Sequence, residues 1–223
     1  YGVNTEVVEY KIPYRETIKG KSDVQGKHKK QSGGAGQYGD VFIRFESTDE
    51  DFLFDEEVFG GAVPKNYFPA VQKGLEESLL EGPLGGFKVT GIHATLYDGS
   101  YHPVDSNEQA FKTAARLAFK KGIEEADPIL LEPVMKLEIR VPESHMGDIM
   151  GDMNKRRGRI LGMEPQQDGS QIIIAEAPLA EVLTYAIDLR SQTSARGTFS
   201  MEFERYEEVP KEITQKVIEA HKE

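Results

Sequence analysis

The order of hydrophobic patterns in the second half of the chain constrains the fold more than any other feature. Apolar residues alternate with period two in some segments and recur with the period of a helix in others, so strands and helices can be assigned in sequence. The predicted elements are a strand at 134–141, a helix at 143–156, strands at 159–165 and 170–176, a helix at 179–191 and a strand at 197–205. This βαββαβ order is typical of a ferredoxin-like split βαβ unit.

The first helix of this unit has an apolar stripe with glycines beside it. The stripe consists of Met146, Ile149, Met150 and Met153. Their spacing predicts one buried face. Gly147 and Gly151 each cost a helix about 1 kcal/mol relative to alanine. We therefore expect these two glycines to pack closely against the sheet.

The first half of the chain predicts a hairpin and two helices. Strand-like segments at 5–18 and 38–46 flank a polar segment at 21–31, and a glycine-rich run follows it, so we expect a hairpin-like tip. Further elements are expected as a helix at 65–81, a strand at 88–97, a helix at 107–126 and a last helix at 211–221. Asp105 or Ser106 is the expected cap of the helix at 107–126. Its expected apolar stripe consists of Ala110, Phe111, Ala114, Ala115, Leu117 and Ala118.

Charge and composition limit the kinds of partner. The net charge is −11, which argues against a protein that coats nucleic acid with its whole surface, because such binding requires lysines and arginines at the phosphates. Lysines gather locally at positions 19, 21, 27, 29 and 30, so any RNA contact should be local. No apolar run approaches the ~20 residues that cross a bilayer, and cysteine is absent, so we expect no membrane span and a cytosolic location.

The glycines at 34, 36 and 39 match the pattern G-x-G-x-x-G. A dinucleotide site is unfavourable because the residues that follow are strand-like, whereas that site requires a helix. A kinase loop is unfavourable because the other kinase motifs are missing. Two interpretations stay open, a flexible turn or a loop whose bare backbone approaches RNA closely.

Searches for catalytic and metal sites give no candidate. The five histidines are dispersed, and Asp148 and Asp152 lack a third oxygen ligand nearby, so we expect no metal site. No phosphate-binding G-x-x-x-x-G-K-[ST] loop and no Ser-His-Asp arrangement is present. His102 lies in a turn-rich segment where packing on Tyr101 is an ordinary role. The cations at 155–159 suit a helix C-terminus, and they could also contact phosphate.

Eight segments in one order resemble elongation factor G. They are PYRETI at 13–18, QSGGAGQYG at 31–39, GGAVP at 60–64, LYDGSYH at 96–102, LEPVM at 131–135, GDIMGDMN at 147–154, RRGR at 156–159 and DLRS at 188–191. The resemblance covers nearly the whole chain. It implies an α+β protein in which 1–8 end a preceding domain, 9–131 form a domain like the second domain of ribosomal protein S5, and 132–223 form a ferredoxin-like domain with a C-terminal helix.

The resemblance also implies functional residues and partners. The two tip loops, at 31–38 and 99–105, are expected to contact transfer RNA and messenger RNA on the ribosome, through Gln31, Ser32, Gly33, Gly34, Gly36, Gln37, Tyr38, Ser100, Tyr101, His102 and Asp105. Ribosomal RNA contacts are expected from Lys27, Lys29, Lys30, Arg156, Arg157 and Arg159. The chain itself is expected to be a monomer without catalytic residues, metal or cofactor, while GTP and Mg²⁺ belong to the full-length parent.

One position departs from the family pattern. Ala35 lies where most translocation factors carry an arginine, so one cation that could meet RNA is missing. This leaves open a paralogue of elongation factor G that acts in ribosome recycling or regulation. A stand-alone ribosome-binding or RNA-binding protein of the same fold is the other alternative.

Overall fold

The computed structural model describes residues 11–223, except for the side chain of Ser32. The segment 1–8, expected to end a preceding domain, and the first part of the strand expected at 5–18 lie outside the described residues. Two compact units make up the chain. The larger unit consists of Tyr14–Leu131 together with Val209–Glu223, and the smaller unit consists mainly of Glu132–Glu208. Both mix strands and helices, as an α+β protein should.

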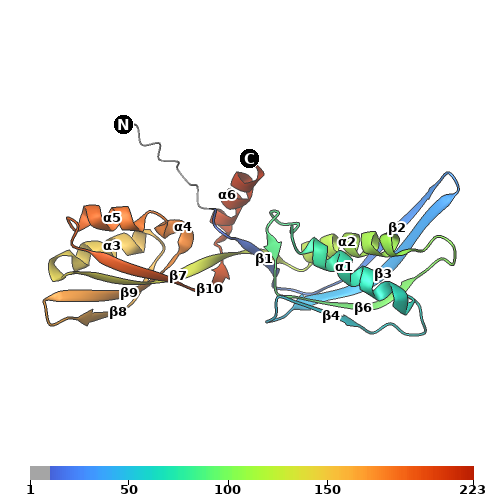
Figure 1. Ribbon diagram of the computed structural model, residues 1–223, viewed down its shortest axis with the longest axis horizontal. Coiled ribbons are helices and arrows are strands. Elements are labelled where there is room, and N and C mark those ends of the chain that lie inside the picture. Colours follow the sequence, from blue (N-terminus) through green and yellow to red (C-terminus); the bar gives the residue numbers. More distant parts are fainter. Residues whose placement is uncertain (1–10) are drawn as a thin grey trace, which may run out of the picture. The chain divides into compact units, whose positions relative to one another are not determined.

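A four-stranded sheet with the order β2-β3-β6-β4 organises the larger unit. The strands are β2 (Ser22–Ser32), β3 (Ala35–Ser47), β4 (Phe52–Glu56) and β6 (Ile92–Ser100). Two helices, α1 (Phe68–Ser78) and α2 (Glu108–Glu125), cover one face of this sheet (Figure 1). A short 3₁₀ turn, η1 (Lys65–Tyr67), precedes α1. The core forms because alternate residues of β3 and β6 meet the apolar stripes of both helices.

Strands β2 and β3 form the predicted hairpin. Their antiparallel register runs from Ser22 opposite Phe45 to Ser32 opposite Ala35. Only Gly33 and Gly34 lie in the turn, with φ of 59° and 95°. Positive φ at both central residues defines a type I′ turn, which glycine adopts without steric cost. The hairpin is confirmed, and its turn has a definite backbone conformation.

Two other glycines let α2 lie directly on the hairpin. A Cβ atom on Gly26 would lie 2.7 Å from the Cβ of Ala118, and one on Gly39 would lie 2.8 Å from the backbone nitrogen of Phe111. Both distances are too short for real Cβ atoms. The small residues of the two elements therefore decide how closely the helix approaches the strands.

A buried carboxylate, that of Glu16, lies in the remaining part of the larger unit. Strand β1 (Arg15–Ile18) pairs with β5 (Lys88–Val89) and with the first residues of β7 (Pro128–Pro142). Glu16 on β1 is fully buried and accepts hydrogen bonds from the N–H groups of Leu84, Gly85 and Phe87 at 2.8, 3.1 and 2.7 Å. Burial raises the pKa of Glu16, and these bonds oppose the rise.

The last helix, α6 (Lys211–Lys222), groups with the larger unit. This differs from the prediction that placed it in the domain at 132–223. The physical reason is its contacts. The ring of His221 stacks on Phe87 with a centroid separation of 4.2 Å, and Ile218 is only 6% exposed and lies beside Gly85. Residues far along the chain thus complete the core at one end of the larger unit.

The smaller unit has the predicted βαββαβ order. Strand β7 is followed by η2 (Glu143–His145), α3 (Met146–Lys155), β8 (Arg159–Pro165), β9 (Ser170–Pro178), α4 (Leu179–Val182), α5 (Tyr185–Gln192) and β10 (Thr198–Glu208). The strand order β10-β7-β9-β8 is that of a ferredoxin-like sheet. Figure 1 shows α3 and α5 on one face of this sheet, where Leu137, Ile139 and Ile173 are buried.

Several local predictions were wrong. Gly147 and Gly151 are exposed, and added Cβ atoms would meet nothing within 4 Å, so they do not pack against the sheet. The cap of α2 is Asn107, whose side chain accepts from the N–H of Ala110 at 2.7 Å, rather than Asp105 or Ser106. Leu117 is 45% exposed rather than buried.

Two element boundaries also differ. The single helix expected at 179–191 is divided into α4 and α5, and β7 begins earlier than the strand expected at 134–141. Within the described residues no helix is long and apolar enough to cross a membrane.

Candidate nucleic-acid interface

The two predicted tip loops lie side by side in the larger unit. The N–H of Tyr38 donates to the carbonyl of Asp105 at 3.0 Å, and the hydroxyl of Ser106 donates to the carbonyl of Tyr38 at 2.8 Å. A Cβ on Gly36 would lie 2.5 Å from a carboxylate oxygen of Asp105, so this glycine makes room for that side chain. Residues far apart in the chain are thereby joined at the end of the hairpin.

A chain of short hydrogen bonds beneath the tip fixes Tyr38. Asp40 is only 5% exposed, and its two carboxylate oxygens accept from Gln25 Nε2 at 2.7 Å and Ser100 Oγ at 2.6 Å. Because the hydroxyl proton of Ser100 is used in this way, Ser100 Oγ accepts from the hydroxyl of Tyr38 at 2.6 Å. Asp40 therefore holds Tyr38 in position through Ser100.

His102 is held by backbone groups of its own loop. Its Nδ1 accepts from the N–H groups of Val104 and Asp105 at 3.2 and 3.0 Å, and its own N–H donates to Ser106 Oγ at 2.9 Å. Nδ1 therefore carries no proton, so in the neutral ring the proton is on Nε2. Nδ1 also lies 3.6 Å from an oxygen of Asp105, which becomes a partner only when the ring is protonated. The 48% exposed side chain offers a single oriented donor at the tip.

The other predicted tip residues divide into free and engaged groups. Gln31, Gly33 and Gly34 are exposed at the turn, and Tyr101 is 49% exposed. Gln37 is engaged, since its side-chain oxygen lies 2.8 Å from His28 Nε2. For Ser32 the structure describes the backbone, which ends strand β2.

The predicted lysines lie along strand β2. Lys27, Lys29 and Lys30 are exposed, and within the described part of the chain none of them takes part in an ion pair. The ammonium group of Lys27 lies 5.5 Å from the centroid of the Tyr38 ring, within the range of a cation–π interaction. The hairpin thus keeps positive charge available beside the tip.

The predicted arginines of the smaller unit are mostly engaged internally. Arg156 donates to Asp152 and Asp188 at 2.8 and 2.6 Å, and Arg157 forms a bidentate pair with Glu132 at 2.7 and 3.0 Å. Glu132 is 3% exposed, so this pair is largely desolvated. Such geometry gives Arg156 and Arg157 structural roles, and it lends no support to their expected RNA contacts.

Arg159 is 69% exposed but shares an anionic partner. Both Arg159 and Arg205 donate to Glu176, at 3.2 and 2.8 Å, and Glu176 is only 8% exposed. The hydrogen bonds from Arg205 lead the causes that lower the pKa of Glu176 to about 2. An RNA contact by Arg159 stays a prediction, and it would compete with this cluster.

This cluster predicts an acid-dependent loss of stability. A lowered carboxyl pKa stabilises the folded state above pH 4.5, and that stabilisation is lost as the pH falls from 4.5 toward about 2. We expect Glu176→Gln to lower the free energy of unfolding by about 1–3 kcal/mol at pH 7 and to flatten its decline below pH 4.5. Urea unfolding at several pH values measures both effects. Glu138→Gln, an exposed position on β7, is the control, and equal acid sensitivity of Glu176→Gln and wild type would contradict the assignment.

Residues that sequence reasoning missed are Asp40, Ser106 and Gln25. Asp40 was detectable only as a carboxylate directly before the alternating apolar residues Val41, Ile43 and Phe45. Gln25 carried no signal and Ser106 was noted only as a possible helix cap, because their roles at the tip depend on partners distant in the chain. Among residues 11–223, no group of three or more His, Cys, Asp or Glu side chains is placed to hold a metal ion.

The chain thus joins an S5-like α+β unit, with polar loops at the end of its hairpin, to a ferredoxin-like α+β unit. The family model "Elongation factor G, domain IV" matches residues 10–127, and "Elongation factor G C-terminus" matches residues 129–217. The chain therefore belongs to the elongation factor G family.

A solved structure agrees with this assignment. A crystal structure of a protein from Thermus thermophilus is similar to the chain at 46% sequence identity and a TM-score of 0.83. The match covers 96% of this chain and 32% of that one, so this chain spans about a third of the length of its structural relative. Both matched models describe regions other than a GTPase domain.

Proposed function

We propose that this chain is the C-terminal, ribosome-binding part of an elongation factor G that promotes the movement of transfer RNA and messenger RNA. GTP hydrolysis, with Mg²⁺, would occur in a domain outside this chain. The observation that carries the proposal is the tip, where His102 is fixed by three hydrogen bonds while its ring stays half exposed. The parent protein would act in the cytoplasm, and the chain would act as a monomer.

The tip is suited to RNA because its shape is set before binding. The hydrogen bonds that connect Gln25, Asp40, Ser100 and Tyr38 already fix these side chains. Binding therefore costs them little conformational entropy. The exposed turn at Gly33 and Gly34 has no side chains, so its backbone can approach a sugar or phosphate closely. Hydrogen-bond donors and aromatic faces are the groups that recognise unpaired nucleotides.

The contribution to translocation is proposed to be positional. Among the described residues no catalytic constellation accompanies the tip, so the domain would act by occupying space and holding RNA after it has moved. Favourable contacts formed only in the moved state shift the equilibrium toward that state. A contact of this kind should change the rate or completeness of movement more than it changes initial binding.

Tethered cleavage of RNA tests where the tip lies. The chain has no cysteine, so Val104→Cys and Lys73→Cys each introduce a single thiol for an iron chelate that generates hydroxyl radicals. Val104 is 82% exposed in the second tip loop, and Lys73 is exposed on α1. We expect the Val104→Cys variant to cleave the RNA of bound ribosomes where transfer RNA and messenger RNA lie, and the Lys73→Cys variant to leave that region intact. Equal cleavage by both variants, or binding without cleavage by the first, would refute the proposed placement.

A paralogue with a recycling or regulatory role is the second candidate. The observation that favours it is Ala35, an exposed residue next to the turn where most translocation factors carry a cation. The intact parent should be assayed for translocation and for separation of ribosomal subunits. Subunit separation without translocation would favour the paralogue, and stimulation of translocation by Ala35→Arg would show that the missing cation limits this activity.

A further inference from the structure

A groove runs along the side of the larger unit, between strand β2 and the outer surface of α2. Its volume is about 420 Å³, and it is lined by Gln25, Gly26, Lys27, Leu117, Lys120, Lys121 and Glu124. None of the α2 residues in it belongs to the tip. The groove therefore presents a second surface of the same unit.

The groove is built where a strand edge meets a helix. β2 is the outermost strand of its sheet, so one edge of its backbone has no partner strand. Gly26 allows α2 to touch this strand, which closes the floor of the groove. Lys121 Nζ donates to the carbonyl of Gln25 at 3.1 Å, so a side chain of α2 reaches this carbonyl at the open edge of the strand. The N–H of the same residue points the same way in an extended strand and is a further donor.

The charge of the groove differs from that of the protein. Lys120, Lys121 and Glu124 of α2 line it together with Lys27, whose ammonium lies over the Tyr38 ring, whereas the whole chain carries a net charge of −11. Across the described residues, Lys27, Lys120 and Lys121 form no ion pair, so their charges are not neutralised by neighbouring carboxylates. Leu117, 45% exposed, supplies an apolar surface between them.

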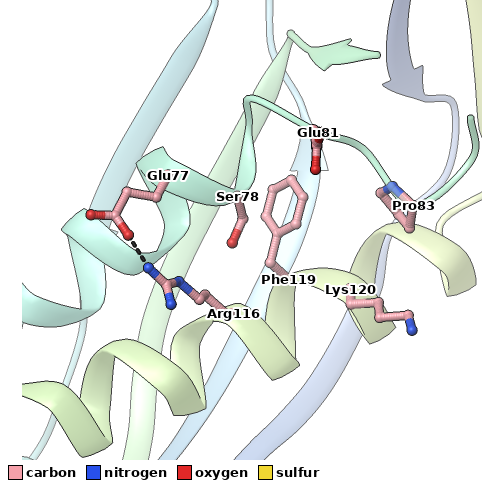
Figure 2. Close-up of a pocket in the computed structure, with 7 residues that line it drawn as sticks. All are labelled: Glu77, Ser78, Glu81, Pro83, Arg116, Phe119 and Lys120. Atoms are coloured by element: carbon pink, nitrogen blue, oxygen red, sulfur yellow. Dashed lines mark hydrogen bonds and ion pairs between the residues drawn. The ribbon is translucent and has the colours of Figure 1, made fainter. Parts of the chain in front are cut away.

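A neighbouring pocket provides a contrast. This pocket, of about 330 Å³, lies where α2 meets the end of α1, and Lys120 borders both hollows. Figure 2 shows the guanidinium of Arg116 directed to Glu77 while Lys120 points away from that pair. Lys112 also contacts Glu77, at 2.7 Å. Lys112 and Arg116 therefore share one carboxylate, whereas Lys120 and Lys121 of α2 have no carboxylate partner among the described residues.

We propose that this groove binds the phosphodiester backbone of an RNA strand, with ammonium groups on the phosphates and Leu117 against a ribose or base. An array of unpaired lysines beside backbone donors is the arrangement that neutralises consecutive phosphates. Lys30, an exposed even position of β2 like Gly26, continues the positive charge on the same face toward the turn. The inference relies on the proposed function only for the source of the RNA, which would be the ribosome or its substrates.

Binding of a fluorescein-labelled oligouridylate of about 20 nucleotides to the 223-residue chain tests the groove without a ribosome. Fluorescence polarisation should be measured across a range of KCl concentrations. Lys120→Gln combined with Lys121→Gln should weaken binding about tenfold and reduce the log–log salt slope by about 1.4, or about 0.7 per lost contact. Lys120→Gln alone, which removes no hydrogen bond, should give about half of the slope change.

Two matched variants separate groove binding from net charge. Lys65→Gln with Lys73→Gln removes the same charge from the α1 region and should change affinity less than about twofold, since exposed charges beyond about 10 Å are screened. Glu124→Gln removes the acid that lines the groove and should tighten binding about twofold to fivefold. These two results together would show that RNA binding depends on the charges in the groove and not on the net charge of the protein.

Three results would overturn the inference. They are equal weakening by the α1 variants, no effect of the groove variants on a chain that still binds RNA, and competition by polyglutamate as strong as by RNA. The last would identify an acidic protein segment as the occupant. Cleavage by the tip-tethered chelate is measured separately, so failure of the groove would leave the proposed function intact.

Discussion

Replacement of Gly26 by alanine is expected to destabilise the larger unit by about 3 kcal/mol or more, a large share of the stability of an ordinary domain. The added methyl group would fall on the carbonyl oxygen of Ala114 and lie 2.7 Å from the Cβ of Ala118. Both obstacles belong to α2 and one is backbone, so relief requires the helix to move away from the hairpin. Hydrogen exchange of α2 and β2 amides, with urea unfolding followed by circular dichroism, measures the loss.

The matched control is Gly162→Ala in strand β8. An added Cβ at Gly162 meets nothing within 4 Å, and its φ is not positive, so the substitution should change stability by less than about 1 kcal/mol. Gly151→Ala on α3 should stabilise the smaller unit by up to about 1 kcal/mol, because the glycine is exposed and alanine favours helix. A tolerated Gly26→Ala would mean that contact between α2 and the hairpin is not needed for folding.

In the full-length parent, His102→Ala is expected to slow translocation about tenfold or more, with ribosome-dependent GTP hydrolysis nearly unchanged. A hydrogen bond formed in the transition state of this movement is worth about 1–2 kcal/mol, and about 1.4 kcal/mol corresponds to tenfold in rate. Hydrolysis should be spared because the GTPase site is proposed to lie in another domain. A single-turnover stopped-flow assay of messenger RNA movement, run beside phosphate release, separates the two steps.

His93→Ala is the control for this experiment. His93 belongs to the same unit, but its ring lies between Glu46 and Asp55 at 3.1 and 2.7 Å on the sheet face away from α2. Its loss should leave both rates near those of the wild type. Asp40→Asn should resemble His102→Ala in a milder form, because Asp40 positions Tyr38 through Ser100. Equal loss of movement and hydrolysis in His102→Ala would refute a specific role of the tip.

The sequence by itself determined the type and order of almost all elements. The βαββαβ order, the hairpin with its glycine turn and the two helices of the larger unit follow from periods of two and 3.6 residues, which are properties of adjacent residues. The family resemblance was confirmed by both family matches. The tip residues Tyr38, Ser100 and His102 were indicated by the family resemblance, whereas the residues of this loop alone gave His102 an ordinary packing role.

Only the tertiary structure decided which side chains are engaged and which are available. Arg157 pairs with Glu132, 25 residues away, and Tyr38 is held through Ser100, 62 residues away, while Lys120 stays free of carboxylates among the described residues. It also showed that Gly26 must be glycine because α2 packs directly against it. An added Cβ at Gly151 would meet no atom within 4 Å, so packing does not require glycine there. The physical reason is that secondary structure depends on short-range backbone preferences, whereas ion pairing and close packing depend on atoms that only folding brings together.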